Sequence, residues 1–121
     1  MTTASFDFEF ASNADWDAVI PILDADGQPM AIGGARALMQ LRSAAGDTTV
    51  AFELSIENGR LAVPDDVTGQ VVLHVSYTEV GRLSGDYAYD LILAANGRHL
   101  RPYAGTVRVA PGVTQWPPTG A

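Results

Sequence analysis

The segment GDYAYDLILA, residues 85–94, places two acids, Asp86 and Asp90, around two tyrosines. Carboxylates beside tyrosine hydroxyls could act as a general acid and base, or could bind a metal ion. In an extended strand, residues of the same parity share one face, and Asp86 lies about 13 Å from Asp90. That distance is too large for one small ion or a shared proton. We therefore predict two separate surface acids rather than a site.

Two other groups of residues could bind a metal ion. His74 and His99 are the only histidines, and no recognisable spacing of metal ligands accompanies them. The stretch DADG at 24–27 resembles the start of a calcium loop. The glycine and glutamate that such a loop requires are replaced by Pro29 and Ala35. We expect surface histidines and a polar turn, with no metal and no cofactor.

Enzymatic chemistry finds little support elsewhere in the chain. The sequence contains no cysteine and no lysine, and no serine lies in a Gly-x-Ser-x-Gly elbow. The pair Asp65-Asp66 could in principle hydrolyse a glycosidic bond. Adjacent acids in a turn that begins with proline are more typical of a solvated turn. We predict that the protein is not an enzyme, and a small acidic enzyme is the least favoured alternative.

The elements that position these residues follow from a hydrophobic period of two, which is typical of half-buried strands. Turn signals recur every 8–12 residues and separate about eight short segments. This pattern predicts an all-β sandwich or barrel. The expected strands are 5–10, 16–23, 34–42, 48–55, 60–64, 70–76, 86–94 and 99–109.

Several local signals refine this picture. The sequences ENG at 57–59 and ANGR at 95–98 predict hairpin turns. Segment 77–85 does not alternate, and Thr78 is a plausible N-cap for a turn or two of helix. Pro21 cannot donate a hydrogen bond to a neighbouring strand, so it marks an edge strand or a bulge.

The strand at 86–94 also predicts part of the core. Its second face is an apolar stripe, and we expect a tyrosine hydroxyl there to bond to the backbone, as in the tyrosine corner of sandwiches. The predicted core residues are Tyr87, Tyr89, Leu91 and Leu93.

Charge narrows the possible partners. The net charge is −7, and residues 1–60 carry −6 of it. An acidic chain without a basic cluster is a poor candidate for binding nucleic acid or an anionic membrane. No apolar run is long enough to span a membrane, and we see no signal peptide at the N-terminus.

We divide the chain into a sandwich domain, residues 1–110, and a Pro- and Gly-rich extended tail, residues 111–121. Tryptophan is enriched at protein interfaces, although core packing is the favoured role of the first of the two tryptophans. A tail of this composition cannot easily bury its own aromatic residue. The candidate interface residues are Trp16, Val113, Trp116, Pro117 and Pro118.

The order of the motifs resembles a known family of small structural proteins of tailed phages and prophages. These are similar to the N-terminal domain of the phage baseplate upper protein. The resemblance spans about residues 15–114, with the strand Gly85–Leu91 and the ending Gly105–Thr114 as its clearest parts. The ordered motifs are DADGQPM, GARALMQLR, GRLAVPDDVTGQVVLHVS, YTEVGRLSGDYAYDLIL, ANGR and GTVRVAPGVT.

The resemblance implies an immunoglobulin-like antiparallel β-sandwich of seven or eight strands. It implies a virion component in a tail, baseplate or head surface, assembled in the bacterial host cytoplasm. Its partners would be other virion proteins, in a symmetric multi-copy assembly. The segments SFDFEF and QWPPTGA do not match the family. No long receptor-binding or coiled-coil region follows, which argues against direct host recognition.

The main alternative is a carbohydrate- or receptor-binding sandwich on a capsid or a host surface. Such a domain needs an exposed aromatic platform, because sugar rings stack on aromatic faces. Trp16 and Tyr103 are the candidates for that platform.

Overall fold

The computed structural model describes residues 3–64, 69–95 and 97–114, and the protein is all-β. No helix in these ranges is long and apolar enough to cross a membrane. The elements are β1 (Ala4–Ser5), β2 (Phe8–Ala11), β3 (Trp16–Pro21), β4 (Arg36–Arg42), β5 (Phe52–Ser55), β6 (Leu61–Ala62), β7 (Gln70–Val75), α1 (Tyr77–Val80), β8 (Gly85–Ala95) and β9 (Arg98–Ala110).

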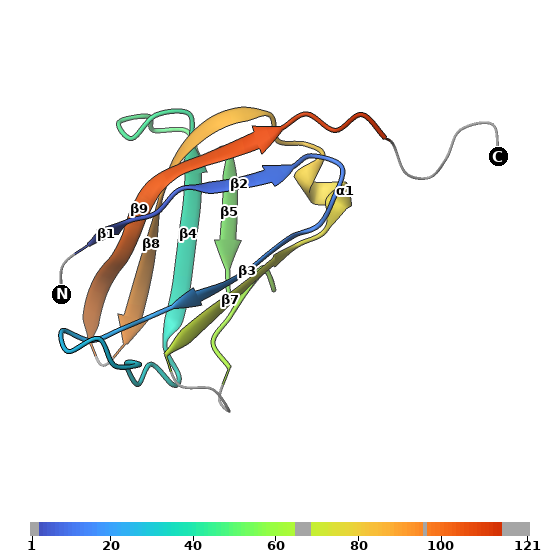
Figure 1. Cartoon of the computed structure of the whole chain (residues 1–121). Helices are drawn as coiled ribbons and strands as arrows, with labels where there is room; N and C mark the ends of the chain where they lie inside the picture. The colour runs from blue at the N-terminus through green and yellow to red at the C-terminus, as the bar shows by residue number, and fades with distance from the viewer. Residues whose placement is uncertain (1–2, 65–68, 96, 115–121) are drawn as a thin grey trace.

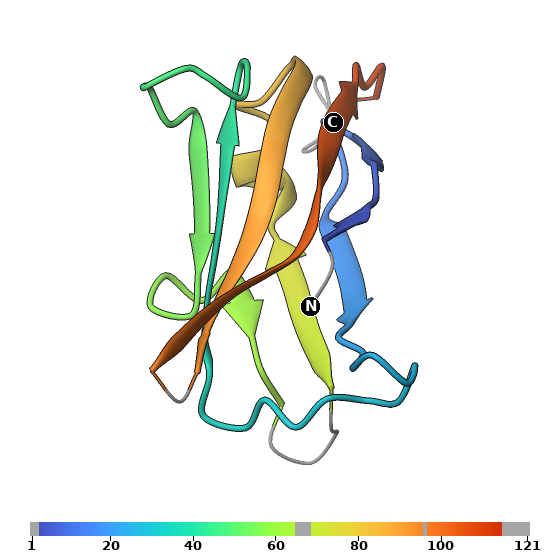
Figure 2. The same ribbon diagram turned by 90° about the vertical axis from the view of Figure 1, so that its left-hand side faces the viewer.

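The strands form two sheets that pack as a sandwich (Figure 1). The large sheet has the order β1-β9-β8-β4-β5, with β2 also paired to β9, and the small sheet has the order β3-β7-β6. Figure 2 shows β4, β8 and β9 running side by side. These two orders match the C-F-G and B-E-D arrangements of the immunoglobulin fold. The predicted β-sandwich is therefore confirmed, although the described residues form nine strands rather than seven or eight, and two of them pair in parallel.

Strand β8 divides core from surface as its alternation predicts. Leu91 and Leu93 are fully buried, Tyr89 is buried, and Tyr87 is half-buried against the core. The backbone N–H of Ser84 donates to the Tyr87 hydroxyl oxygen at 3.1 Å. This is the tyrosine corner of sandwich domains, placed at the start of β8.

One of the two predicted hairpins is wrong. ANGR joins β8 to β9, with Ala95 paired to Arg98. The ENG turn instead leads from β5 in the large sheet to β6, which pairs with β7 in the small sheet. The Asn58 side chain directs this crossing: its Oδ1 accepts from Ser55 N–H at 3.0 Å, and its Nδ2 donates to the Glu53 carbonyl oxygen at 3.0 Å.

The predicted cap of α1 is also wrong. The N-cap is Ser76 rather than Thr78, and Ser76 makes no side-chain hydrogen bond to the helix backbone. Asp15 supplies that bond, because its Oδ1 accepts from Tyr77 N–H at 2.7 Å. Asp15 lies in the loop between β2 and β3, far from α1 in the sequence. The residues next to the helix therefore do not reveal which side chain caps it.

Two prolines lie within strands, one on an edge strand and the other at a shift in register. Pro21 ends β3, which lies at the edge of the small sheet, as predicted. Pro102 lies inside β9, where the register shifts by one residue: Leu91 pairs with Tyr103, but Leu93 pairs with Leu100. The shift accommodates a residue that cannot donate a hydrogen bond to β8.

The expected N-terminal strand is split into β1 and β2, and both pair in parallel with β9. The break at Phe6 and Asp7 lies over Gly105, where a Cβ atom would overlap the Phe6 carbonyl oxygen. Asp7 Oδ1 accepts from Thr106 N–H at 3.0 Å, in place of a backbone acceptor. The Tyr89 hydroxyl donates to the same Phe6 carbonyl at 2.6 Å.

An aromatic cluster joins this strand to both sheets. The rings of Phe10 and Trp16 stack with centroids 4.2 Å apart, and Phe8 meets Trp16 edge-on at 5.5 Å. Phe8 also contacts Tyr89, at 5.3 Å. Such contacts contribute about 0.5–1.5 kcal/mol each beyond the area that they bury. The cluster thus connects β2 and β8 of the large sheet to β3 of the small one.

We predict that Gly105→Ala destabilises the domain by about 1–3 kcal/mol, because the added methyl group must displace the backbone at Phe6. Urea unfolding followed by circular dichroism measures the loss. Gly33→Ala is the matched control, since a Cβ atom there meets nothing within 4 Å. Equal stability of the Gly105→Ala variant and the control would contradict the close approach.

Candidate functional site

Three surfaces of the described residues carry side chains that could do chemistry or make contacts. The first is the outer face of the large sheet, which we define by the side chains that point away from the core. On β4, β8 and β9, register places Arg42 beside Ala88, Gln40 beside Asp90, Leu38 beside Ile92, Arg36 beside Ala94, Ala94 beside His99 and Asp86 beside Arg108.

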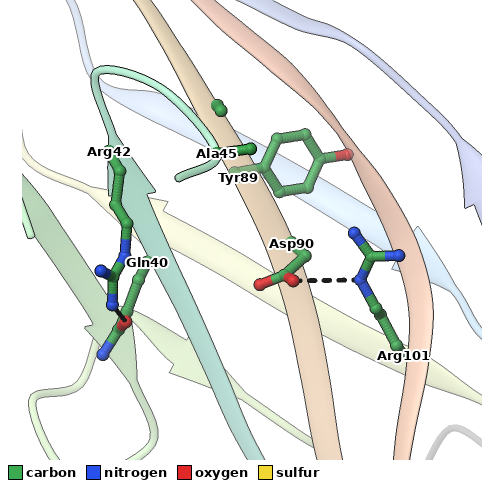
Figure 3. A pocket seen from close by; sticks show the side chains of 7 residues that line it. Gln40, Arg42, Ala45, Tyr89, Asp90 and Arg101 are labelled. Carbon is green, nitrogen blue, oxygen red and sulfur yellow. Dashed lines mark hydrogen bonds and ion pairs between the residues drawn. The ribbon is translucent and has the colours of Figure 1, made fainter. Parts of the chain in front are cut away.

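A polar hollow of about 310 Å³ lies on this outer face (Figure 3). Figure 3 shows Asp90 of β8 directed toward Arg101 of β9, while Gln40 and Arg42 lie together on β4. Arg101 Nε lies 3.0 Å from Asp90 Oδ2. Arg42 donates to Gln40 Oε1 at 2.8 Å, and Gln40 donates to Glu53 Oε1 at 2.9 Å. Each charged side chain that lines the hollow therefore has a polar partner within the domain.

The predicted separation of Asp86 and Asp90 is consistent with this register. Asp86 lies beside Arg108, whereas Asp90 lies beside Ala104 and pairs with Arg101. The structure does not bring the two carboxylates into one site.

A second, more apolar hollow of about 190 Å³ lies next to the first, on the same outer face. Leu38, which is 37% exposed, lines it together with Ile92 and Ala94. The ion pair between Arg36 and Glu57 borders it, with Arg36 Nε 2.8 Å from Glu57 Oε1. Sequence reasoning missed Leu38, although its place among the outward residues of 34–42 was a usable signal.

The second surface is a cluster of Asp15, Asp17 and His74. Their ligand atoms lie within 4.8 Å of one another, so among the described residues this group could hold a metal ion. The pairing of β3 with β7 places Asp17 opposite His74, where the two side chains form an ion pair. Asp15 already accepts from the N–H of Tyr77. We assign these groups to the fold, because an ion pair and a helix cap account for them.

The third surface is the C-terminal exit, which we define as residues 111–114 with Ser12 and Asn13. Gly112 N–H donates to Ser12 Oγ at 3.0 Å, and Asn13 Nδ2 donates to the Thr114 carbonyl oxygen at 2.8 Å. The domain itself therefore holds the first residues of the predicted tail. Between these two bonds Val113 is 94% exposed.

The predicted interface residues fall in different places. Val113 is exposed at the C-terminal exit, whereas Trp116, Pro117 and Pro118 lie outside the described residues. Trp16 is wrong as an interface residue: it is 3% exposed and stacks on Phe10 within the domain.

The aromatic platform expected for a carbohydrate-binding sandwich is not formed by the two candidates. Trp16 is in the core. Tyr103 is half-buried, and its hydroxyl donates to the Pro21 carbonyl oxygen at 2.6 Å.

No protein-family model matches the chain, and no curated protein matches it. The role of the chain has to be inferred from its residues and their geometry.

We predict that His74 titrates above the ordinary histidine pKa of 6.5, because the Asp17 carboxylate accepts its hydrogen bond and attracts its positive charge. Its raised pKa means that the ion pair stabilises the fold fully below pH 6.5. This contribution is lost as the pH rises through the raised value. Titration of the ring protons by NMR measures the pKa.

The matched variant is Asp17→Asn, which keeps the shape and removes the charge. The pKa of His74 should fall toward 6.5 in this variant. An unchanged pKa would show that the pair does not form in solution.

Proposed function

We propose that the chain is a structural component of a tailed bacteriophage or phage-like particle, in its tail, baseplate or head surface. It acts by binding other virion proteins and has no catalytic step. The order of motifs supports the phage assignment, and the immunoglobulin-like sandwich is the fold that this resemblance implies.

The observation that carries the proposal is the exposed valine at the C-terminal exit. Val113 is held outward by hydrogen bonds at the residues on both sides of it. An apolar side chain in a fixed position loses little entropy on binding, and burying a valine contributes about 1.5–3 kcal/mol. The exit therefore offers a preformed anchor for a neighbouring protein, at the end of β9 (Figure 1).

The state of the polar groups also suits a scaffold. In the described residues, no buried side-chain nitrogen or oxygen lacks a hydrogen-bond partner. Reaction centres commonly hold strained or unpaired polar groups. In the polar hollow, Asp90 instead pairs with Arg101, and Arg42 is hydrogen-bonded to Gln40.

Edge strands give a second means of contact. Strands β3 and β5 lie at the edges of their sheets, and an edge can pair with an extended segment of another protein. Pro21 at the end of β3 limits how far such pairing can extend along that edge.

The first test is the presence of the chain in particles purified by density gradient from the bacterium that encodes it. Mass spectrometry should find it at a fixed ratio to the other virion proteins. Its absence from purified particles would overturn the proposed function.

The second test addresses the exit. Val113→Asp should lower incorporation into particles by about tenfold, since a loss of about 1.4 kcal/mol changes binding tenfold. Deletion of residues 113–121 should lower it at least as much. The matched control is Val50→Asp, an exposed valine before β5, which should be incorporated normally. Normal incorporation of the Val113→Asp chain would show that the C-terminal exit does not contribute to assembly.

A further inference from the structure

We propose that two copies of this chain pack against each other through the outer face of the large sheet. The inference rests on the proposed function in one respect: an assembly with several copies brings these faces to high local concentration. The geometry itself belongs to the isolated chain. It is carried by the distribution of charge and by the exposed apolar centre of the face.

The outer face is nearly balanced in charge, while the protein as a whole is not. Four arginines and five acids lie on it, a net charge of −1, so the remaining three arginines and nine acids of the chain carry −6 of the net charge of −7. The charged residues of the outer face are Arg36, Arg42, Arg101, Arg108, Glu9, Glu53, Glu57, Asp86 and Asp90.

This distribution selects how two copies can approach. Two chains of charge −7 repel each other over most of their surface, and the repulsion opposes close contact. On the outer face the repulsion is much weaker, because arginines lie next to acids there. Arg36 lies against Glu57 and Arg101 lies against Asp90. Such a surface can meet a copy of itself related by a two-fold axis.

The centre of the face is apolar. Leu38 of β4 and Ile92 of β8 are cross-strand neighbours. Ala94 and His99 line the same hollow as these two residues. These residues line the second hollow, and the polar hollow lies beside it, so the face is shallowly indented there. An apolar centre inside a ring of paired charges is the usual anatomy of a protein interface.

The outer face of the small sheet is the rival surface. Val19 is 59% exposed there and lies beside Val72, so it also offers apolar area. Its end carries Asp15 and Asp17, with His74 as the single basic partner. Two copies that met through this face would bring four carboxylates together, so charge favours the large sheet.

The size of the face sets the expected affinity. Four strands spaced about 4.8 Å apart and about seven residues long cover roughly 440 Å². This places the contact at the small end of specific interfaces, where complexes are weak. We expect a dissociation constant of about 10 µM to 1 mM, which suits contacts made many times in one particle.

Sedimentation equilibrium of the full chain between about 20 µM and 1 mM tests the inference in this range. The wild-type chain should show a monomer–dimer equilibrium. Leu38→Asp should abolish it, because the aspartate puts a charge into the apolar centre. Val19→Asp is the matched control: it makes the same change at an exposed strand position on the other sheet, and it should dimerise like the wild type.

NMR of the wild-type chain at increasing concentration gives a measurement that needs no variant. The amide signals of outward residues on β4, β8 and β9 should shift together, while those of β3 and β7 stay constant. A wild-type monomer at 1 mM, or shifts confined to β3 and β7, would overturn the inference. Loss of the dimer in both aspartate variants would overturn it as well.

These experiments are separate from the particle tests. A dimer in solution together with absence from purified particles would leave the interface standing and remove the proposed function. A monomer in solution together with presence in particles would leave the proposed function standing and remove the interface.

Discussion

The close passage of the N-terminal strand over Gly105 is the constraint on which the rest of the sandwich depends. The backbone of Phe6 and Asp7 comes so near β9 that no side chain fits beneath it. This allows β1 and β2 to pair in parallel with β9 and carries Phe8 and Phe10 over the core. The same passage brings residues 12 and 13 next to residues 112–114, so the C-terminal exit depends on it too.

The absence of cysteine explains why the aromatic contacts matter. Antibody domains join their two sheets with a disulfide between strands B and F, which here correspond to β3 and β8. This chain has no cysteine. Trp16 of β3 and Tyr89 of β8 instead meet through Phe8, and the Tyr89 hydroxyl bonds to the Phe6 carbonyl. Aromatic packing therefore links the sheets where a covalent bond would otherwise do so.

The sequence predicted what local pattern determines. Alternation identified β8 and its buried leucines, because neighbouring residues alone decide which side of a strand is apolar. It did not predict the crossing at ENG, the capping of α1 by Asp15, or the meeting of Asp17 with His74. Each of these depends on which strands become neighbours, and such information is spread over tens of residues.

Core and surface are coupled through β8. Leu91 and Leu93 fill the core, while Asp90 and Ile92, the alternate residues, form part of the outer face. Because the period is two, a slip of one residue would exchange the two sets and destroy the core and the surface together. Burial of the leucines thus also fixes the positions of the outward residues. A surface held in this way is preorganised, so little entropy is lost when another chain binds to it.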